Sequence, residues 1–206
     1  MAQERTVIVT GGTRGIGFAI AARFLEKGDC VYVCARKKTD SLPEAGGLRA
    51  KFKSVDLRDS DAAEAFISEV VAESGSLDVL INNAGGSPYC EASQASTRFS
   101  ESIIKLNLLA PLWLSQFANA RMQTQKDGGA IVNIASVSGV RASPGTAAYG
   151  AAKAGLLNLT KSLGVEWAPK VRVNAVVAGL IETECSHLHY GDAEAMDAVR
   201  RTVPMQ

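Results

Sequence analysis

The sequence predicts an α/β fold in which a doubly wound parallel sheet carries helices on both faces. Short runs rich in Val and Ile alternate with longer segments of helical periodicity, the pattern of right-handed βαβ units. The short runs lack a clean alternation of apolar and polar residues, as expected of strands that are buried on both faces. The length of 206 residues fits one domain.

Five short runs predict clear strands, and a sixth is weaker. The clear strands are 6–10, 30–35, 79–81, 130–135 and 171–177, and the weaker one lies near 51–55. Helical periodicity covers 15–27, 60–74, about 95–123 and 148–167. The segment 37–48 contains Pro43 and two adjacent glycines, so we expect a short or irregular crossover there.

Composition excludes several classes of partner. The formal charge is +1, from 22 Lys and Arg against 21 Asp and Glu, so no global field would hold nucleic acid or an anionic membrane. No signal-peptide shape and no run long enough for a membrane span are visible. The four cysteines form no C-x-x-C pair. We therefore expect a cytoplasmic protein that binds neither nucleic acid nor membrane.

The first predicted strand leads directly into TGGTRGIG, residues 10–17. Glycine allows the backbone to approach a pyrophosphate, and the helix that follows offers free N–H groups at its N-terminus. Arg14 places a cation where it opposes the helix dipole, a conflict that an anionic partner would remove. Because a strand precedes the glycines and a helix follows, we interpret the loop as a nucleotide site; a purely structural turn is the alternative.

The second strand ends in a basic stretch, with Arg36, Lys37 and Lys38 after Ala35. Folds that prefer NAD carry an acidic residue at this point, which holds the ribose 2′-OH. A carboxylate would repel a 2′-phosphate, whereas an arginine binds one bidentately. The stretch therefore predicts NADP(H), with NAD(H) as the alternative.

Tyr149 and Lys153 stand four residues apart in a predicted helix, so they share one face. A lysine cation about 5 Å from a phenol favours the phenolate by about 3 kcal/mol at an effective dielectric constant of about 20. The cation therefore lowers the pKa of the tyrosine towards the range useful for acid–base catalysis.

Four motifs follow one another along the chain: T-G-x-x-x-G-x-G, N-N-A-G at 82–85, a serine after the fifth strand and Y-x-x-x-K. In this order and spacing, the sequence resembles the short-chain dehydrogenase/reductase family from about residue 5 to 203. The likeness extends to 3-oxoacyl-carrier-protein-reductase-like members. It implies a single Rossmann-type domain over 1–206 and an oxidoreductase that interconverts a ketone and a secondary alcohol with a nicotinamide cofactor. Members usually continue with a further helix and strand, so we expect a domain that is C-terminally truncated relative to the family.

The resemblance implies four catalytic residues, namely Asn107, Ser136, Tyr149 and Lys153. Ser136 precedes Tyr149 by thirteen residues, the family spacing, and Ser138 is the alternative. Asn107 would hold a water that links Lys153 to solvent, and Asn82 would support the central sheet. The residues expected to bind the cofactor are Gly11, Thr13, Arg14, Gly15, Ile16, Gly17, Arg36, Asp56, Leu57, Asn83, Ala84, Gly85, Tyr149, Lys153, Gly179, Ile181 and Thr183.

The substrate pocket is expected from 86–96 and 180–203, and its substrate is a small carbonyl compound or alcohol of unspecified type. Cys185, His187 and His189 alternate in the second segment, but we expect no metal there because no convincing partner ligands lie nearby. The helix at 148–167 is apolar around much of its circumference, which favours a subunit contact in a homodimer or homotetramer over a two-sided core helix.

Two other functions fit parts of the same pattern. A nucleotide-binding scaffold or regulatory protein would use the fold without the chemistry. An epimerase, dehydratase or lyase would use the same tyrosine–lysine pair without net oxidation or reduction.

Overall fold

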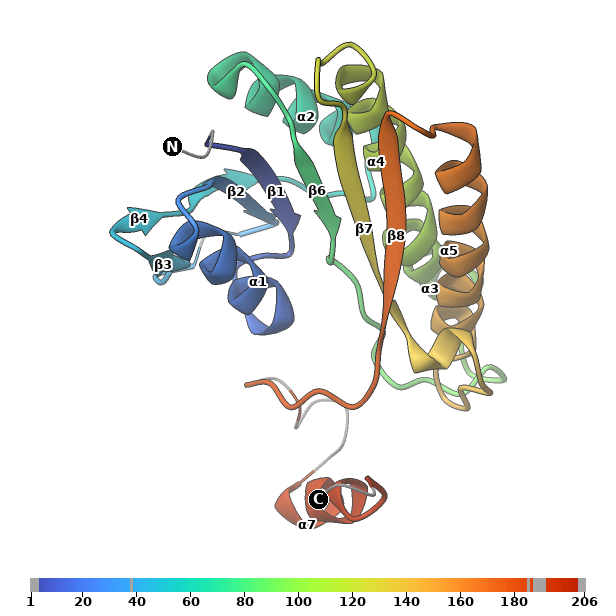
Figure 1. Ribbon diagram of the computed structural model, residues 1–206. Coiled ribbons are helices and arrows are strands. Elements are labelled where there is room, and N and C mark those ends of the chain that lie inside the picture. Colours follow the sequence, from blue (N-terminus) through green and yellow to red (C-terminus); the bar gives the residue numbers. More distant parts are fainter. Residues whose placement is uncertain (1–3, 38, 185, 187–191, 204–206) are drawn as a thin grey trace.

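The computed structural model describes residues 4–37, 39–184, 186 and 192–203. Its centre is a six-stranded parallel sheet in the order β5-β2-β1-β6-β7-β8 (Figure 1). Numbered along the chain, this is the order 3-2-1-4-5-6 of a Rossmann-type sheet. The strands are β1 (Thr6–Thr10), β2 (Cys30–Ala35), β5 (Lys51–Ser54), β6 (Val79–Asn82), β7 (Gly129–Ser136) and β8 (Val171–Ala178). The predicted fold class is confirmed.

Helices cover both faces of the sheet, and successive residues of a strand pack in opposite directions. On one face, Val7 and Val9 of β1 pack with α1 (Gly15–Glu26). On the other face, Ile8 belongs to the core formed with α2 (Ser60–Ser74), α4 (Ala110–Met122) and α5 (Ala147–Glu166). The strands β1, β2 and β6 are therefore buried on both sides, which explains their continuous apolar runs.

Among its described residues, the crossover from β2 to β5 contains no helix. It forms a small hairpin of β3 (Glu44–Ala45) and β4 (Leu48–Arg49), which lies against α1. Gly46 and Gly47 at its turn have positive φ values of 60° and 76°, which glycine adopts without strain. The irregular crossover expected at 37–48 is confirmed.

The helical segment predicted at about 95–123 is divided in three. It consists of α3 (Thr97–Ile104), a π-helical turn η1 (Lys105–Leu109) and α4. The side-chain amide of Asn107 in this turn donates to the carbonyl oxygens of Gly86 and Ile103, both at 2.9 Å. A π-turn inside a helix often marks a functional site, and here it places Asn107 against the loop that follows β6.

Asn82 and Asn133 form a buried hydrogen-bonded pair between β6 and β7. The sequence predicted that Asn82 supports the central sheet. The Nδ2 atom of Asn82 on β6 donates to Oδ1 of Asn133 on β7 at 2.8 Å and to Oγ of Ser115 on α4 at 3.0 Å. Asn133 in turn donates to Oγ1 of Thr160 on α5 at 2.9 Å. These bonds fix β6 and β7 to the helices that carry the remaining site residues.

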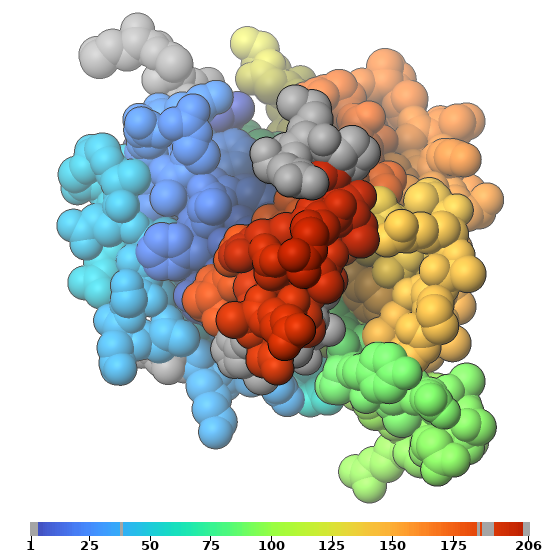
Figure 2. All heavy atoms as spheres, turned by 90° about the horizontal axis from the view of Figure 1, so that it is seen from below, coloured from blue at the N-terminus to red at the C-terminus, as the bar shows by residue number. Residues whose placement is uncertain are grey.

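The last described part of the chain lies apart from the sheet. After β8 the backbone runs beneath the carboxyl ends of the strands, and α7 (Ala193–Arg200) lies below this edge (Figures 1 and 2). The sequence analysis did not predict α7. Within the described ranges, no helix combines the length and apolar character needed to cross a membrane.

Candidate active site

The predicted site residues gather at the carboxyl edge of the sheet, where β1, β6 and β7 end. Thr10 closes β1, Asn82 closes β6 and Ser136 closes β7. The strand order reverses between β1 and β6, and ligands of open α/β sheets bind in the crevice at such a reversal.

Thr10 joins the glycine loop to the turn after β6. Its hydroxyl donates to the carbonyl oxygen of Ile81 at 3.2 Å and accepts from the backbone N–H groups of Asn83 and Ala84, both at 2.9 Å. The side-chain amide of Asn83 donates to the carbonyl oxygen of Thr10 at 2.8 Å. The N-N-A-G stretch is therefore held in place by the first residues of the glycine loop.

The glycine loop is shaped by close approach of backbones. Gly11 has a φ of 62°, and a Cβ added there would lie 3.0 Å from the Cα of Ala84. A Cβ on Gly17 would lie 2.4 Å from Nδ2 of Asn83, so only glycine fits at this position. Gly15 begins α1 with a φ of 54°, and its N–H points away from the helix. Ile16 follows in the first turn, half-buried.

A cavity of about 330 Å³ opens beside the N-terminus of α1. It is lined by Thr13, Arg14, Gly15, Phe18, Ala19 and Glu184. A backbone N–H at a helix start, glycine at the closest approach and an arginine in the lining form a donor set suited to a pyrophosphate. The residues of the loop thus fit the diphosphate of a dinucleotide.

Lys153 is buried next to Tyr149 on the first turns of α5. Its Nζ atom is 5.6 Å from the centre of the Tyr149 ring and donates to the carbonyl oxygen of Ile134 at 2.7 Å. The lysine is 3% exposed, and this burial lowers its pKa to about 8. Lys153 is therefore still largely protonated at neutral pH, and it remains a cation beside the phenol.

Asn107 reaches the same place from the π-turn. Its Oδ1 atom accepts from the N–H of Gly86 at 2.8 Å, and the side chain is fully buried. A Cβ added to Gly85 would lie 2.6 Å from Oδ1 of Asn107 and 3.3 Å from Nζ of Lys153. Gly85 thus lets the asparagine and the lysine approach each other, and the structure brings these predicted site residues together.

The side chain of Ser136 is oriented by the short 3-10 turn η2 (Val137–Gly139). The N–H of Ser138 in this turn donates to Oγ of Ser136 at 3.2 Å. This turn packs on α5 beside Lys153, since a Cβ on Gly139 would lie 2.7 Å from the carbonyl carbon of that lysine. Ser136 therefore enters the site from the strand that neighbours the tyrosine helix.

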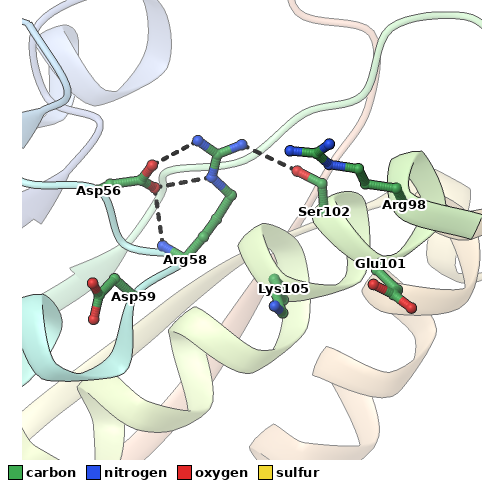
Figure 3. Close-up of a pocket in the computed structure, with 7 residues that line it drawn as sticks. All are labelled: Asp56, Arg58, Asp59, Arg98, Glu101, Ser102 and Lys105. Atoms are coloured by element: carbon green, nitrogen blue, oxygen red, sulfur yellow. Dashed lines mark hydrogen bonds and ion pairs between the residues drawn. The ribbon is translucent and has the colours of Figure 1, made fainter.

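The adenine side of the predicted site contains an ion pair that the sequence analysis missed. Both carboxylate oxygens of Asp56 are hydrogen-bonded to Arg58, with Nε–Oδ1 at 2.9 Å and a second nitrogen–Oδ2 distance of 2.6 Å (Figure 3). The hydrogen bond from Arg58 is the main reason why the pKa of Asp56 lies below its ordinary value. Arg58 also donates to Oγ of Ser102 on α3 at 3.1 Å, so it joins two elements.

These residues line a cavity of about 450 Å³ (Figure 3). Leu57 is buried beside it. Arg36 lies exposed at the end of β2, and its carbonyl oxygen accepts from Oγ of Ser54 at 3.0 Å. Its positive charge also contributes to the lowered pKa of Asp56, which places the two side chains in the same electrostatic environment.

The segment after β8 passes beneath the site and reaches the glycine loop (Figure 1). Gly179 and Ile181 are exposed. A Cβ on Gly15 would lie 3.5 Å from Cγ2 of Thr183, and Oε1 of Glu184 accepts from the N–H of Gly15 at 2.8 Å. Glu184 was not among the predicted site residues, because it lies 169 positions from Gly15 in the sequence and no local pattern indicates the contact.

Part of the predicted substrate region falls outside the described residues. Cys185, His187 and His189 all lie there, as does Lys38 of the basic stretch. Among the residues that are described, no group of three His, Cys, Asp or Glu side chains is arranged to hold a metal ion.

The sheet order and the glycine loop define a protein of the Rossmann-type, dinucleotide-binding class. A family model for the short chain dehydrogenases matches residues 5–192, and the chain therefore belongs to the short-chain dehydrogenase/reductase family of oxidoreductases, which use nicotinamide cofactors.

Individual relatives agree with this assignment. The 3-oxoacyl-[acyl-carrier-protein] reductase FabG of Chlamydia trachomatis serovar D is 36% identical over 188 residues, which cover 88% of this chain and 75% of the relative. The structure of a putative short-chain alcohol dehydrogenase from Sinorhizobium meliloti 1021 matches with a TM-score of 0.89 and 33% identity, over 97% of this chain and 81% of that one. A 4-hydroxyisoleucine dehydrogenase complexed with NADH matches with a TM-score of 0.80 and 34% identity, over 89% and 78%.

Proposed function

We propose that this chain is an NADP(H)-dependent oxidoreductase that interconverts a ketone and a secondary alcohol, with Tyr149 as the acid–base residue. The observation that carries the proposal is the position of Lys153, whose buried Nζ atom lies 5.6 Å from the Tyr149 ring. A buried cation beside a phenol favours the phenolate, because the interior screens the two charges less than water does.

The remaining residues supply position and polarity. When bound, the nicotinamide cofactor supplies the hydride. Tyr149 gives a proton to the carbonyl oxygen in reduction and takes one from the alcohol in oxidation. Ser136 holds the same oxygen by a hydrogen bond and stabilises the charge that develops on it. Asn107 fixes the turn around Gly86 and thereby the wall next to Lys153.

The preference for NADP(H) rests on Arg36 at the end of β2. No carboxylate occupies this place, and Asp56 on the neighbouring loop is already paired with Arg58. A 2′-phosphate would therefore meet the Arg36 guanidinium, while the charge of the neighbouring Asp56 is balanced by Arg58.

The exposed surface of α5 supports a subunit contact. Ala151 and Ala154 are exposed on this helix, and Val165 is 82% exposed. The small alanines would let a second copy of the chain pack closely on this helix. We propose a homodimer or homotetramer in the cytoplasm, built from a single domain.

A panel of carbonyl compounds, assayed with NADPH and with NADH, tests the reaction class. The panel contains a 3-oxoacyl thioester, which is the substrate type named for the Chlamydia relative, together with a small ketone, a keto sugar and a steroid ketone. An oxidoreductase consumes reduced cofactor in a fixed ratio to the alcohol formed. An epimerase or dehydratase would change a substrate with no net change in cofactor, and a scaffold would bind cofactor without turnover.

Cofactor preference is tested by Arg36→Asp, with Lys37→Asp as the matched control. Arg36→Asp should invert the ratio of kcat/KM for NADPH over NADH, because the new carboxylate repels the 2′-phosphate and accepts from the ribose hydroxyl of NADH. The control carries the same charge change one residue further on and should move the ratio much less. An unchanged ratio in Arg36→Asp would show that Arg36 does not bind the phosphate.

A further inference from the structure

We infer that Glu184 competes with the diphosphate of the cofactor for the N-terminus of α1 and so limits the affinity for dinucleotides. The inference rests on the proposed function, since it requires a dinucleotide at the glycine loop. Glu184 lies in the segment that was expected to line the substrate pocket. The inference gives this residue an effect on cofactor binding instead.

The N-terminus of α1 lacks an anionic partner from its own sequence. Its first turn holds no acidic residue, and the side chain of Arg14 at the N-cap position makes no capping hydrogen bond. The carboxylate of Glu184 supplies the missing acceptor, with Oε1 at 2.8 Å from the N–H of Gly15. A carboxylate at a helix start is stabilised both by this charge-assisted hydrogen bond and by the helix dipole.

A bound diphosphate would require the same place. The N–H of Gly15 is the donor that the glycine loop presents at the start of the helix, and Glu184 lines the cavity beside it together with Thr13 and Arg14. A carboxylate oxygen and a phosphate oxygen cannot both accept at 2.8 Å from one N–H without lying against each other. Two anions at that separation repel, so binding of the cofactor must displace the carboxylate.

Glu182 provides a control within the same segment. It has the same charge as Glu184 but pairs with Arg200 of α7, at 2.7 Å. Its exposed ion pair is of the kind that contributes little to stability. Glu182→Gln and Glu184→Gln therefore change the charge of the chain equally, and only the second removes the negative charge that faces the N–H of Gly15.

The experiment is calorimetric titration of the full chain and both variants with NADPH, NADH, inorganic pyrophosphate and adenosine. We expect Glu184→Gln to bind NADPH, NADH and pyrophosphate about threefold more tightly, the size of a charge effect at an exposed helix N-terminus. Adenosine, which has no phosphate, should bind all three proteins equally. Glu182→Gln should match the unaltered chain for every ligand.

Hydrogen exchange at the Gly15 amide gives a second readout that does not depend on cofactor. The amide should be protected in the unaltered chain and in Glu182→Gln, and Glu184→Ala should lose this protection. Unchanged or weaker dinucleotide binding in Glu184→Gln, or an equal gain in Glu182→Gln, would overturn the competition. Absence of dinucleotide binding in all three proteins would overturn the proposed function, and the inference with it.

Discussion

The two sides of the site are held in different ways. On the sheet side, Thr10, Asn83, Asn107 and Lys153 are fixed by hydrogen bonds to backbone atoms of neighbouring elements, and three of the four are fully or almost fully buried. On the other side, the segment 179–184 is attached to the glycine loop by a hydrogen bond from Gly15 to an exposed glutamate. The residues around Lys153 are therefore preorganised, whereas the segment 179–184 is weakly attached.

This contrast fits a division of roles in the proposed function, in which the buried residues serve the reaction and the weakly attached segment serves ligand entry. Preorganised donors cost no reorganisation during the reaction, and they are most effective where water is excluded. Segments with few buried contacts open at low free energy, which suits a region that must admit and release ligands. In the proposed function, the fold combines a rigid acid–base centre with an entrance that different substrates can shape.

The largest effect on stability is expected from Thr10→Val. Valine keeps the shape of threonine but removes the hydroxyl that accepts from Asn83 and Ala84. The N–H of Ala84 then loses its acceptor, and that of Asn83 keeps the carbonyl oxygen of Ile81 at 3.0 Å. The loss should lower the free energy of unfolding by about 3 kcal/mol, measured by urea denaturation.

Thr183→Val is the matched change on the other side, since within the described part of the chain the Thr183 hydroxyl makes one long contact, with Oγ of Ser186 at 3.5 Å. Its cost should stay below about 0.5 kcal/mol, as for a surface substitution. Equal losses in the two variants would remove the contrast between the two sides.

An effect smaller than that of Thr10→Val is expected from the titration of Lys153. Burial lowers its pKa to about 8 in the folded chain, whereas the unfolded chain keeps the ordinary value of 10.5. Between these two pH values the unfolded chain binds more protons, so stability rises with pH. From pH 7 to 9.5 the rise attributable to this lysine should be about 2 kcal/mol.

Lys153→Met isolates this contribution, because every other titrating group is common to both proteins. The difference in unfolding free energy between the unaltered chain and the variant should change in favour of the unaltered chain as pH rises through this range. A difference that stays constant from pH 7 to 9.5 would mean that Lys153 keeps an ordinary pKa and is better hydrated than its 3% exposure indicates.

The sequence predicted the sheet and the glycine loop well because both depend on local patterns. Val and Ile runs mark strands buried on both faces, and glycines between a strand and a helix mark the loop. Tyr149 and Lys153 share a face of α5 as their spacing required, and the cation lies 5.6 Å from the ring.

Other features depend on contacts between distant residues and have no local signal. The π-turn at Asn107 is associated with bonds to Gly86, 21 positions away. Asp56 was predicted as an adenine-binding residue from its residue type and position. The structure adds its hydrogen bonds to Arg58, which the sequence pattern did not indicate. Glu184 meets Gly15 only because β8 directs the chain back beneath the sheet.

The central claim is that Tyr149 is the proton donor held ready by Lys153. The direct test is a single-turnover measurement of NADPH oxidation with a carbonyl substrate of the panel, comparing the unaltered chain with Tyr149→Phe, after the NADPH affinity of each has been measured. The account predicts that Kd for NADPH stays within about twofold while hydride transfer slows by at least about a hundredfold, the range of general acid catalysis. Carbonyl reduction at an undiminished rate in Tyr149→Phe would contradict it.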